Sequence, residues 1–168
     1  MRFILDANAL IYLVKTDIFP LFMELINQDV VIDNNVYKEV VEDGIENNYP
    51  DAYTAKTLIE NNQIPIIPID ITSSLDKFRD PGETSCYILA KKEGMCISSD
   101  VRANRKFENQ NIAFMELDTF FYNQFLLNNI KKKRFIRILD ELKQVNGTSA
   151  NRISVFLELI SKRSDKNG

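Results

Sequence analysis

Four acidic residues of this 168-residue chain stand where side chains can meet and do chemistry. Asp6 and Asp100 each follow a short apolar run that is typical of a buried strand. Glu39 lies on a helical pattern after another such run, and Glu83 opens the helical pattern that precedes Asp100. Because the carboxyl ends of adjacent parallel strands meet at one edge of a sheet, we expect the four carboxylates to converge there.

Carboxylates gathered in this way would repel one another, and their pKa values would rise. A divalent cation relieves this repulsion, and hard oxygen ligands favour Mg²⁺ or Mn²⁺ over zinc. The chain contains no histidine, which excludes an imidazole base and a histidine-ligated zinc site. The expected metal site suits in-line hydrolysis of a phosphodiester, in which the metal activates water and stabilises the departing oxygen.

Each of the four acids also has a purely structural explanation. Asp6 and Asp100 are good helix N-caps. Glu83 follows Gly82 at a helix start, where the helix dipole favours a carboxylate. Glu39 is interior to its helix and fits a solvated surface position equally well.

Polar and basic residues beside the acids are candidates for orienting ligands or contacting substrate. Asn8 and Ser99 adjoin the acids, where they fit either ligand orientation or local turn hydrogen bonds. Three basic residues follow Asp100 on the next predicted helix, where they fit either phosphate contact or a solvated basic face: Arg102, Arg105 and Lys106.

Short apolar runs that alternate with helical patterns predict one α/β domain with a mostly parallel sheet. We predict buried strands over 3–5, 30–32, 95–98 and 112–115, and an edge strand over 64–69 because that run holds two prolines. Near the N-terminus, helices are predicted over 7–15, from a cap at Asp17, and from 34 to an end at Gly44. Further helices are predicted over 51–61, 70–79, 83–94, 101–110, 118–128, 131–144 and 149–162, with Asp118 as the cap of the helix over 118–128.

Composition and charge narrow the class of protein. No run of about 18 apolar residues exists and no secretory signal is present, so we expect a cytoplasmic protein without a membrane span. Cys86 and Cys96 are expected to be buried, reduced thiols. Residues 1–128 hold 20 acids and 11 bases, whereas 129–168 hold 4 acids and 10 bases. The acidic body does not suit binding of nucleic acid by bulk charge, and the basic end fits RNA binding, partner docking or a solvated helical face.

Four segments in this order and spacing resemble the PIN-domain family of metal-dependent ribonucleases: DANALIYL, VYKEV, PGETSCYILA and ISSDVRANRKF. The resemblance covers roughly 2–117, and the family's acidic positions match Asp6, Glu39, Glu83 and Asp100. It implies a three-layer α/β/α fold with a central, mostly parallel sheet of about five strands, and one or two Mg²⁺ or Mn²⁺ ions. The family often has a further acid or asparagine shortly after the Asp100 position, for which Asn104 is the nearest residue here.

The leading hypothesis is a metal-dependent endoribonuclease that hydrolyses RNA through the acidic quartet, with a nuclease domain over 1–128 and a helical extension over 129–168 packed on the same domain. Many family members are VapC-type toxins of toxin–antitoxin pairs, so the resemblance implies an RNA substrate, an antitoxin partner and a homodimer. The alternative is a catalytically silent PIN-like module that binds RNA or protein. A phosphotransfer domain with Asp6 as nucleophile is disfavoured, because Asn8 stands where such enzymes need a second acid.

Overall fold

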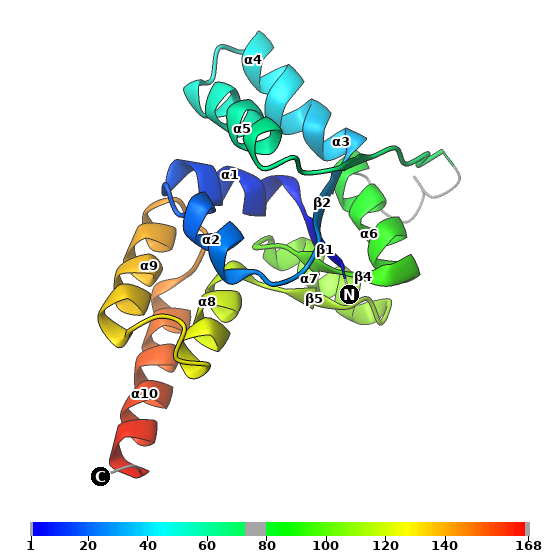
Figure 1. Ribbon diagram of the computed structural model, residues 1–168. Helices are drawn as coiled ribbons and strands as arrows, with labels where there is room; N and C mark the ends of the chain where they lie inside the picture. The colour runs from blue at the N-terminus through cyan, green and yellow to red at the C-terminus, as the bar shows by residue number, and fades with distance from the viewer. Residues whose placement is uncertain (1, 73–79, 167–168) are drawn as a thin grey trace.

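The computed structural model describes residues 2–72 and 80–166. Its centre is a five-stranded, all-parallel sheet with the strand order β3-β2-β1-β4-β5 (Figure 1). The strands are β1 (Arg2–Leu5), β2 (Val30–Asp33), β3 (Ile66–Ile67), β4 (Gly94–Ile97) and β5 (Phe114–Met115). Since β1 lies between β2 and β4, the segments that follow these three strands leave the sheet at one edge, as the sequence predicted.

The central strands are buried because they read as nearly continuous apolar runs, which is typical of parallel strands covered on both faces. Ile4 of β1 is aligned with Val31 of β2 on one side and with Cys96 of β4 on the other, and all three side chains are buried. Prolines at 65 and 68 flank the two-residue strand β3, so this edge strand pairs only briefly with β2.

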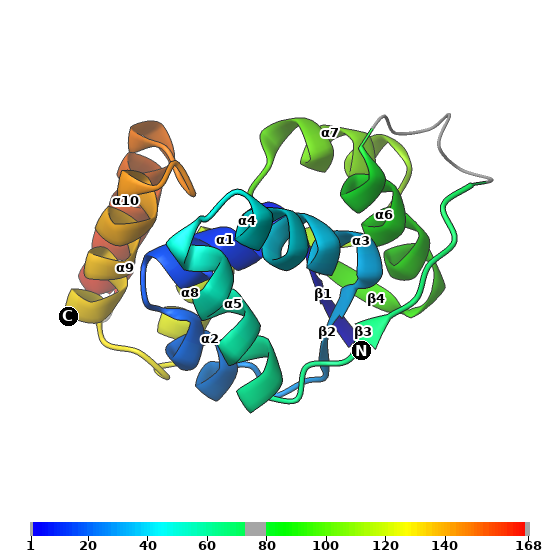
Figure 2. The same ribbon diagram turned by 90° about the horizontal axis from the view of Figure 1, so that it is seen from above.

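The helices are α1 (Ala7–Lys15), α2 (Phe19–Leu25), α3 (Asn34–Tyr37), the π-helix η1 (Lys38–Asp43), α4 (Gly44–Glu46), α5 (Pro50–Asn61), α6 (Pro81–Glu93), α7 (Val101–Asn109), α8 (Leu117–Leu126), α9 (Lys132–Gln144) and α10 (Ala150–Lys166). Figures 1 and 2 place α1, α2 and α8 on one side of the sheet and α6 and α7 on the other. These layers confirm the predicted three-layer α/β/α fold class. Within the described ranges, the structure has no helix with the length and apolar character that a membrane crossing requires.

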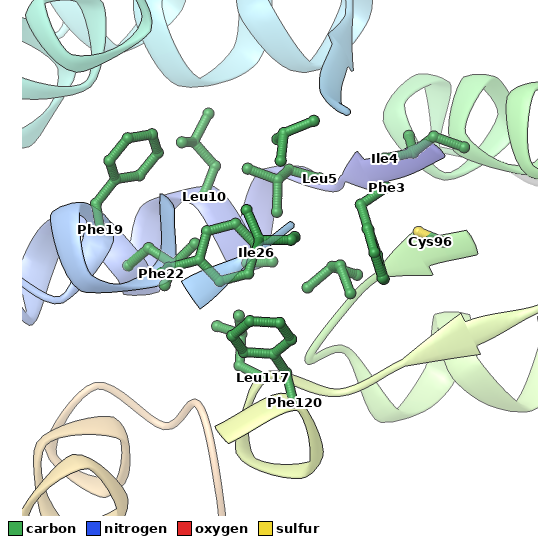
Figure 3. Close-up of a cluster of buried hydrophobic side chains, with 14 of the residues drawn as sticks. Phe3, Ile4, Leu5, Leu10, Phe19, Phe22, Ile26, Cys96, Leu117 and Phe120 are labelled. Atoms are coloured by element: carbon green, nitrogen blue, oxygen red, sulfur yellow. The ribbon is translucent and has the colours of Figure 1, made fainter. Parts of the chain in front are cut away.

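The main core lies between the sheet and the helices α1, α2 and α8. Phe22 of α2 and Phe120 of α8 are both buried, and their ring centroids are 4.8 Å apart. Figure 3 shows these rings facing Ile26 and Leu117 below α1. Burying such side chains contributes roughly 1.5–3 kcal/mol each, so this core fixes the position of the sheet edge from which the acids project.

Two helix boundaries predicted in the first third of the chain were wrong. Asp17 does not cap α2, because it adopts a left-handed backbone conformation (φ 54°) and Ile18 takes the cap position without a side-chain hydrogen bond. Gly44 does not end the helix after β2, because its φ of −63° is helical and the chain continues through α4 to Glu46. A Cβ atom at Gly44 would lie 2.7 Å from the Cβ of Ala52, so this glycine permits close packing of α5.

Asp118 was predicted to cap α8, but Glu116 occupies the cap position and Asp118 lies inside the helix. The Asp118 side chain is buried against Arg152 of α10, with Arg152 Nη2 at 2.5 Å from its Oδ1. Helices α9 and α10 lie beside α8, and α10 projects away from the sheet (Figure 1). Most of the helix predicted over 70–79 lies outside the described residues, and the described part is not helical.

Candidate active site

Asp6 links the end of β1 to the start of α1. Its Oδ1 accepts a hydrogen bond of 2.6 Å from the Ala9 N–H, which caps the helix, and only 8% of the residue is exposed. Burial raises the pKa of Asp6 to about 7, against the hydrogen bonds from Ser98 and Ala9. The nearby carboxylates of Asp100 and Glu39 raise it further. Capping therefore does occur, but it leaves a buried acid in an acidic environment.

Asp100 occupies the matching position between β4 and α7. Its Oδ1 accepts hydrogen bonds from the backbone N–H groups of Arg102 (2.7 Å) and Ala103 (3.0 Å), so it caps α7. Its Oδ2 accepts a longer hydrogen bond of 3.5 Å from the Asn8 amide. Because Asn8 stands two residues after Asp6, this contact joins the two strand-end acids across the sheet edge.

Glu39 lies in η1, a short π-helix of the kind that is often found at functional sites. Its side chain is exposed, yet its pKa is raised above the ordinary value. The largest cause is desolvation by the surrounding protein, followed by the carboxylates of Asp80, Asp43 and Asp33. Glu39 is therefore not an ordinary solvated surface residue.

Glu83 lies in the first turn of α6, where Asp80 is the N-cap and accepts a 2.8 Å hydrogen bond from the Glu83 N–H. The Glu83 carboxylate forms a short ion pair with the Lys106 ammonium of α7. A Cβ atom at Gly82 would lie 3.2 Å from Asp80 Oδ1 and 3.3 Å from Glu39 Oε2. This glycine lets the backbone of α6 approach both carboxylates closely.

The predicted acids surround one cavity of about 70 Å³. Its lining residues come from the ends of β1 and β4, from α1 and α7 that follow these strands, from η1 and from the start of α6: Asp6, Ala7, Asn8, Glu39, Asp80, Gly82, Glu83, Asp100 and Ala103. The sheet topology thus brings all four acids named from the sequence to the same place, together with Asn8.

Two residues of the site were missed by the sequence reasoning. Asp80 was assigned only to a turn, although a capping aspartate before Pro81 and Gly82 is a readable helix start. The Ser98 hydroxyl hydrogen-bonds to Asp6 and accepts a bond of 3.2 Å from the Asp100 N–H. No sequence signal distinguishes Ser98 from its neighbour Ser99.

The remaining sequence candidates lie around the cavity rather than in it. The Ser99 Oγ is buried without a hydrogen-bond partner in the described structure. Asn104 is buried and its amide donates to the Ser98 carbonyl (3.3 Å) and to Glu116 Oε1 (3.2 Å), so it braces α7. Arg102 and Arg105 are exposed on α7, and Lys106 is paired with Glu83.

The donors around the cavity are oxygens of the kind that Mg²⁺ and Mn²⁺ prefer. The free thiols of Cys86 and Cys96 are buried in the core, as predicted; the Cys96 hydrogen bond and burial raise the pKa of Cys86. Across residues 2–72 and 80–166, no three acidic or thiol side chains already form a metal-holding group. A buried Asp6 beside like charges is nevertheless the electrostatic setting that a divalent cation relieves, so the residues present fit such an ion.

The parallel sheet, its two helical layers and the acids at one sheet edge define a nuclease-type α/β domain. A family model described as a PIN domain matches residues 2–116. The chain therefore belongs to the PIN-domain family, whose members are generally nucleases that typically depend on a divalent metal. A comparison with curated proteins found no match.

Proposed function

We propose that this protein is a Mg²⁺- or Mn²⁺-dependent endoribonuclease. The observation that carries the proposal is the position of Asp6, Glu39, Glu83 and Asp100 around one small cavity. The raised pKa values of Asp6 and Glu39 support it, because such repulsion and desolvation are relieved by a cation rather than by the protein itself. Membership of the PIN-domain family supports hydrolysis of a nucleic-acid phosphodiester.

The proposed role of each cavity residue follows from its position. Asp6 and Asp100 would hold the cation, with Ser98 fixing the Asp6 carboxyl and Asn8 fixing Asp100 Oδ2. A bound divalent cation would supply Lewis-acid activation of the attacking water and neutralise charge at phosphorus. Glu39 also lines the cavity, where it would accept a proton from water as a general base.

The exposed basic residues of α7 are suited to the RNA backbone. Arg102 and Arg105 lie on the same helix that Asp100 caps, so phosphates that they contact would pass close to the cavity. Contacts of this kind position RNA without reading its sequence. Their loss would weaken RNA binding, most strongly at low salt, more than it would change the rate of the chemical step.

Incubation of a mixed RNA substrate with Mn²⁺, Mg²⁺ or EDTA tests the proposal. We expect internal cleavage in Mn²⁺ and Mg²⁺, no cleavage in EDTA, and products with 5′-phosphate and 3′-hydroxyl ends. Cleavage that continues unchanged in EDTA would contradict a metal-dependent site.

A silent PIN-like module is the second candidate, because the described acids do not form a ready-made metal group. Mn²⁺ titration distinguishes the two. An enzyme binds Mn²⁺ through Asp6 and Asp100, so Asp6→Asn reduces the binding, whereas in a silent module Asp6→Asn leaves any Mn²⁺ binding unchanged.

A role as the toxin of a toxin–antitoxin pair, with an antitoxin partner and a homodimeric state, is part of the main proposal. We expect toxicity on expression that is lost in Asp6→Asn.

A further inference from the structure

One basic residue forms a direct contact with the acidic cavity. Lys106, in the second half of α7, places its ammonium on Glu83 Oε2 across the gap between α7 and α6. The Glu83 side chain is 18% exposed and the Lys106 side chain is 42% exposed. The ion pair is therefore partly accessible to solvent, and it lies beside the cavity that Glu83 lines.

The Lys106–Glu83 ion pair determines which acids of the cavity have their negative charge neutralised by the protein. The described residues that line the cavity include five acids and no base, so Lys106 neutralises Glu83 from outside the lining. The carboxylate of Asp100 contributes to the raised pKa of Asp6, and within the described residues no ion pair to a base is seen for either acid. The negative charge that a cation would balance is thus carried by the other acids of the lining, Asp6 and Asp100 among them, and Glu83 is already paired.

We propose that Lys106 competes with a divalent cation for Glu83, so that the free protein holds its metal mainly through Asp6 and Asp100. This inference rests on the metal site of the proposed function and deepens it. A partly exposed ion pair is weak, so a phosphate group of the substrate can draw the ammonium away from Glu83. Lys106 then contacts the phosphate, and Glu83 becomes a further ligand only when substrate is bound.

Titration with Mn²⁺, followed by the electron paramagnetic resonance signal of the free ion, tests this competition in the absence of RNA. Lys106→Met should bind Mn²⁺ at least about tenfold more tightly than wild type, which is the size of effect that one adjacent charge has on a carboxylate. Arg105→Met is the matched control, because it removes the same charge from an exposed neighbouring position. Its Mn²⁺ affinity should stay within about twofold of wild type, since exposed charges are screened by salt.

The single variant Glu83→Gln and the double variant Lys106→Met with Glu83→Gln complete a double-mutant cycle. The gain in affinity should disappear in this variant, because no carboxylate is released, and thermal unfolding verifies that each variant is folded. The inference is overturned if Lys106→Met binds Mn²⁺ like wild type, if Arg105→Met gains equally, or if the double variant keeps the gain. If neither wild type nor any variant binds Mn²⁺, the proposed function is contradicted as well. If wild type binds Mn²⁺ and cleaves RNA but Lys106→Met does not change the Mn²⁺ affinity, only this inference is overturned.

Discussion

Among single residues, Asp6 dominates the electrostatics of the cavity. Burial raises its pKa from 3.8 to about 7 in the folded, metal-free protein. Between these two pH values the folded protein keeps a proton that the unfolded chain releases. The free energy of unfolding therefore falls as the pH rises from about 4 to about 7, and the stabilisation is complete only below this window.

Replacing Asp6 by Asn should remove this dependence and stabilise the metal-free protein at pH 8. The neutral amide keeps an oxygen that accepts the Ala9 N–H but has no charge to bury. We expect a gain on the order of 2 kcal/mol in the free energy of unfolding at pH 8 in EDTA, and little gain at pH 4. Urea unfolding at both pH values measures it, with the exposed Asp140→Asn as control. An equal effect at the two pH values would contradict a raised Asp6 pKa.

Gly82→Ala should impair the cavity while leaving the fold intact. The new Cβ would lie 3.2–3.3 Å from oxygen atoms of Asp80 and Glu39, and these side chains would have to move. We expect Mn²⁺ affinity to fall several-fold with a change in unfolding free energy below about 1 kcal/mol. Calorimetric titration and urea unfolding of the same preparation measure the two effects. A loss of stability without a loss of affinity would count against a metal role for this wall.

The predictability of site residues depends on how local their signal is. Asp6 and Asp100 were predicted because an apolar run that ends in aspartate before a helix is visible in the sequence. Asp80 and Ser98 were missed as site residues, because their contacts depend on where the ends of α6 and β4 meet the cavity. Lys106 was predicted either to contact phosphate or to belong to a solvated basic face, and its ion pair with Glu83 was missed because it spans two helices.

Among the helices, α4 and α5 pack closely against each other and against η1, the helix that contains Glu39. Gly44 lies against Ala52, and no side chain larger than hydrogen fits between them. Helix-ending glycines usually adopt a positive φ, whereas Gly44 has a φ of −63°. The sequence pattern cannot distinguish a glycine that ends a helix from one that permits helix packing, and for this reason the predicted end at Gly44 was wrong.

Gly44→Ala should therefore destabilise the protein. A Cβ 2.7 Å from that of Ala52 forces the two helices apart, at a cost of about 1–3 kcal/mol in the free energy of unfolding. Glu46→Ala, at an exposed position of the same short helix, should change it by less than about 0.5 kcal/mol. Chemical denaturation of the two variants measures the difference. Stabilisation by Gly44→Ala, as expected for a simple gain in helix propensity, would contradict the packing role.

In the whole molecule, an ion pair joins the partly exposed Arg152 of α10 to the buried Asp118 of α8. Arg152 of α10 donates through Nε to Asp118 Oδ2 (2.6 Å) and through Nη2 to Asp118 Oδ1 (2.5 Å). Its Nη2 also lies 2.5 Å from Glu116 Oε2, and Glu116 Oε1 accepts from Asn104 of α7. A chain of contacts thus runs from the C-terminal extension to the helix that Asp100 caps.

Arg152→Met should be strongly destabilising, because it leaves the buried Asp118 carboxylate without its guanidinium. We expect a loss of about 3–5 kcal/mol in the free energy of unfolding. Adding Asp118→Asn to this variant should recover a large part of the loss, since the uncompensated charge is then removed. Guanidinium-induced unfolding of the single and double variants measures both steps. An Arg152→Met protein as stable as wild type would show that the extension is not held by this pair.

This long-range contact marks the limit of prediction from the sequence. The α/β class followed from apolar runs and helical patterns that are local in the chain, whereas the strand order around β1 was not predicted. Asp118 was instead predicted to be a helix cap. Its partner Arg152 lies 34 residues away, and no local sequence pattern indicates that the two side chains pair. The assignment of 129–168 to the same domain as 1–128 remains a prediction.

Single-turnover cleavage of RNA in Mn²⁺ by wild type, Asp6→Asn and Asp140→Asn tests the central claim most directly. Asp6 is buried in the cavity, whereas Asp140 is exposed on α9, so the two variants remove the same charge inside and outside the site. We predict cleavage by wild type and Asp140→Asn at similar rates, and a loss of at least about 10³-fold in Asp6→Asn despite a stable fold. Cleavage by folded Asp6→Asn at the wild-type rate would contradict an active site in the acidic cavity.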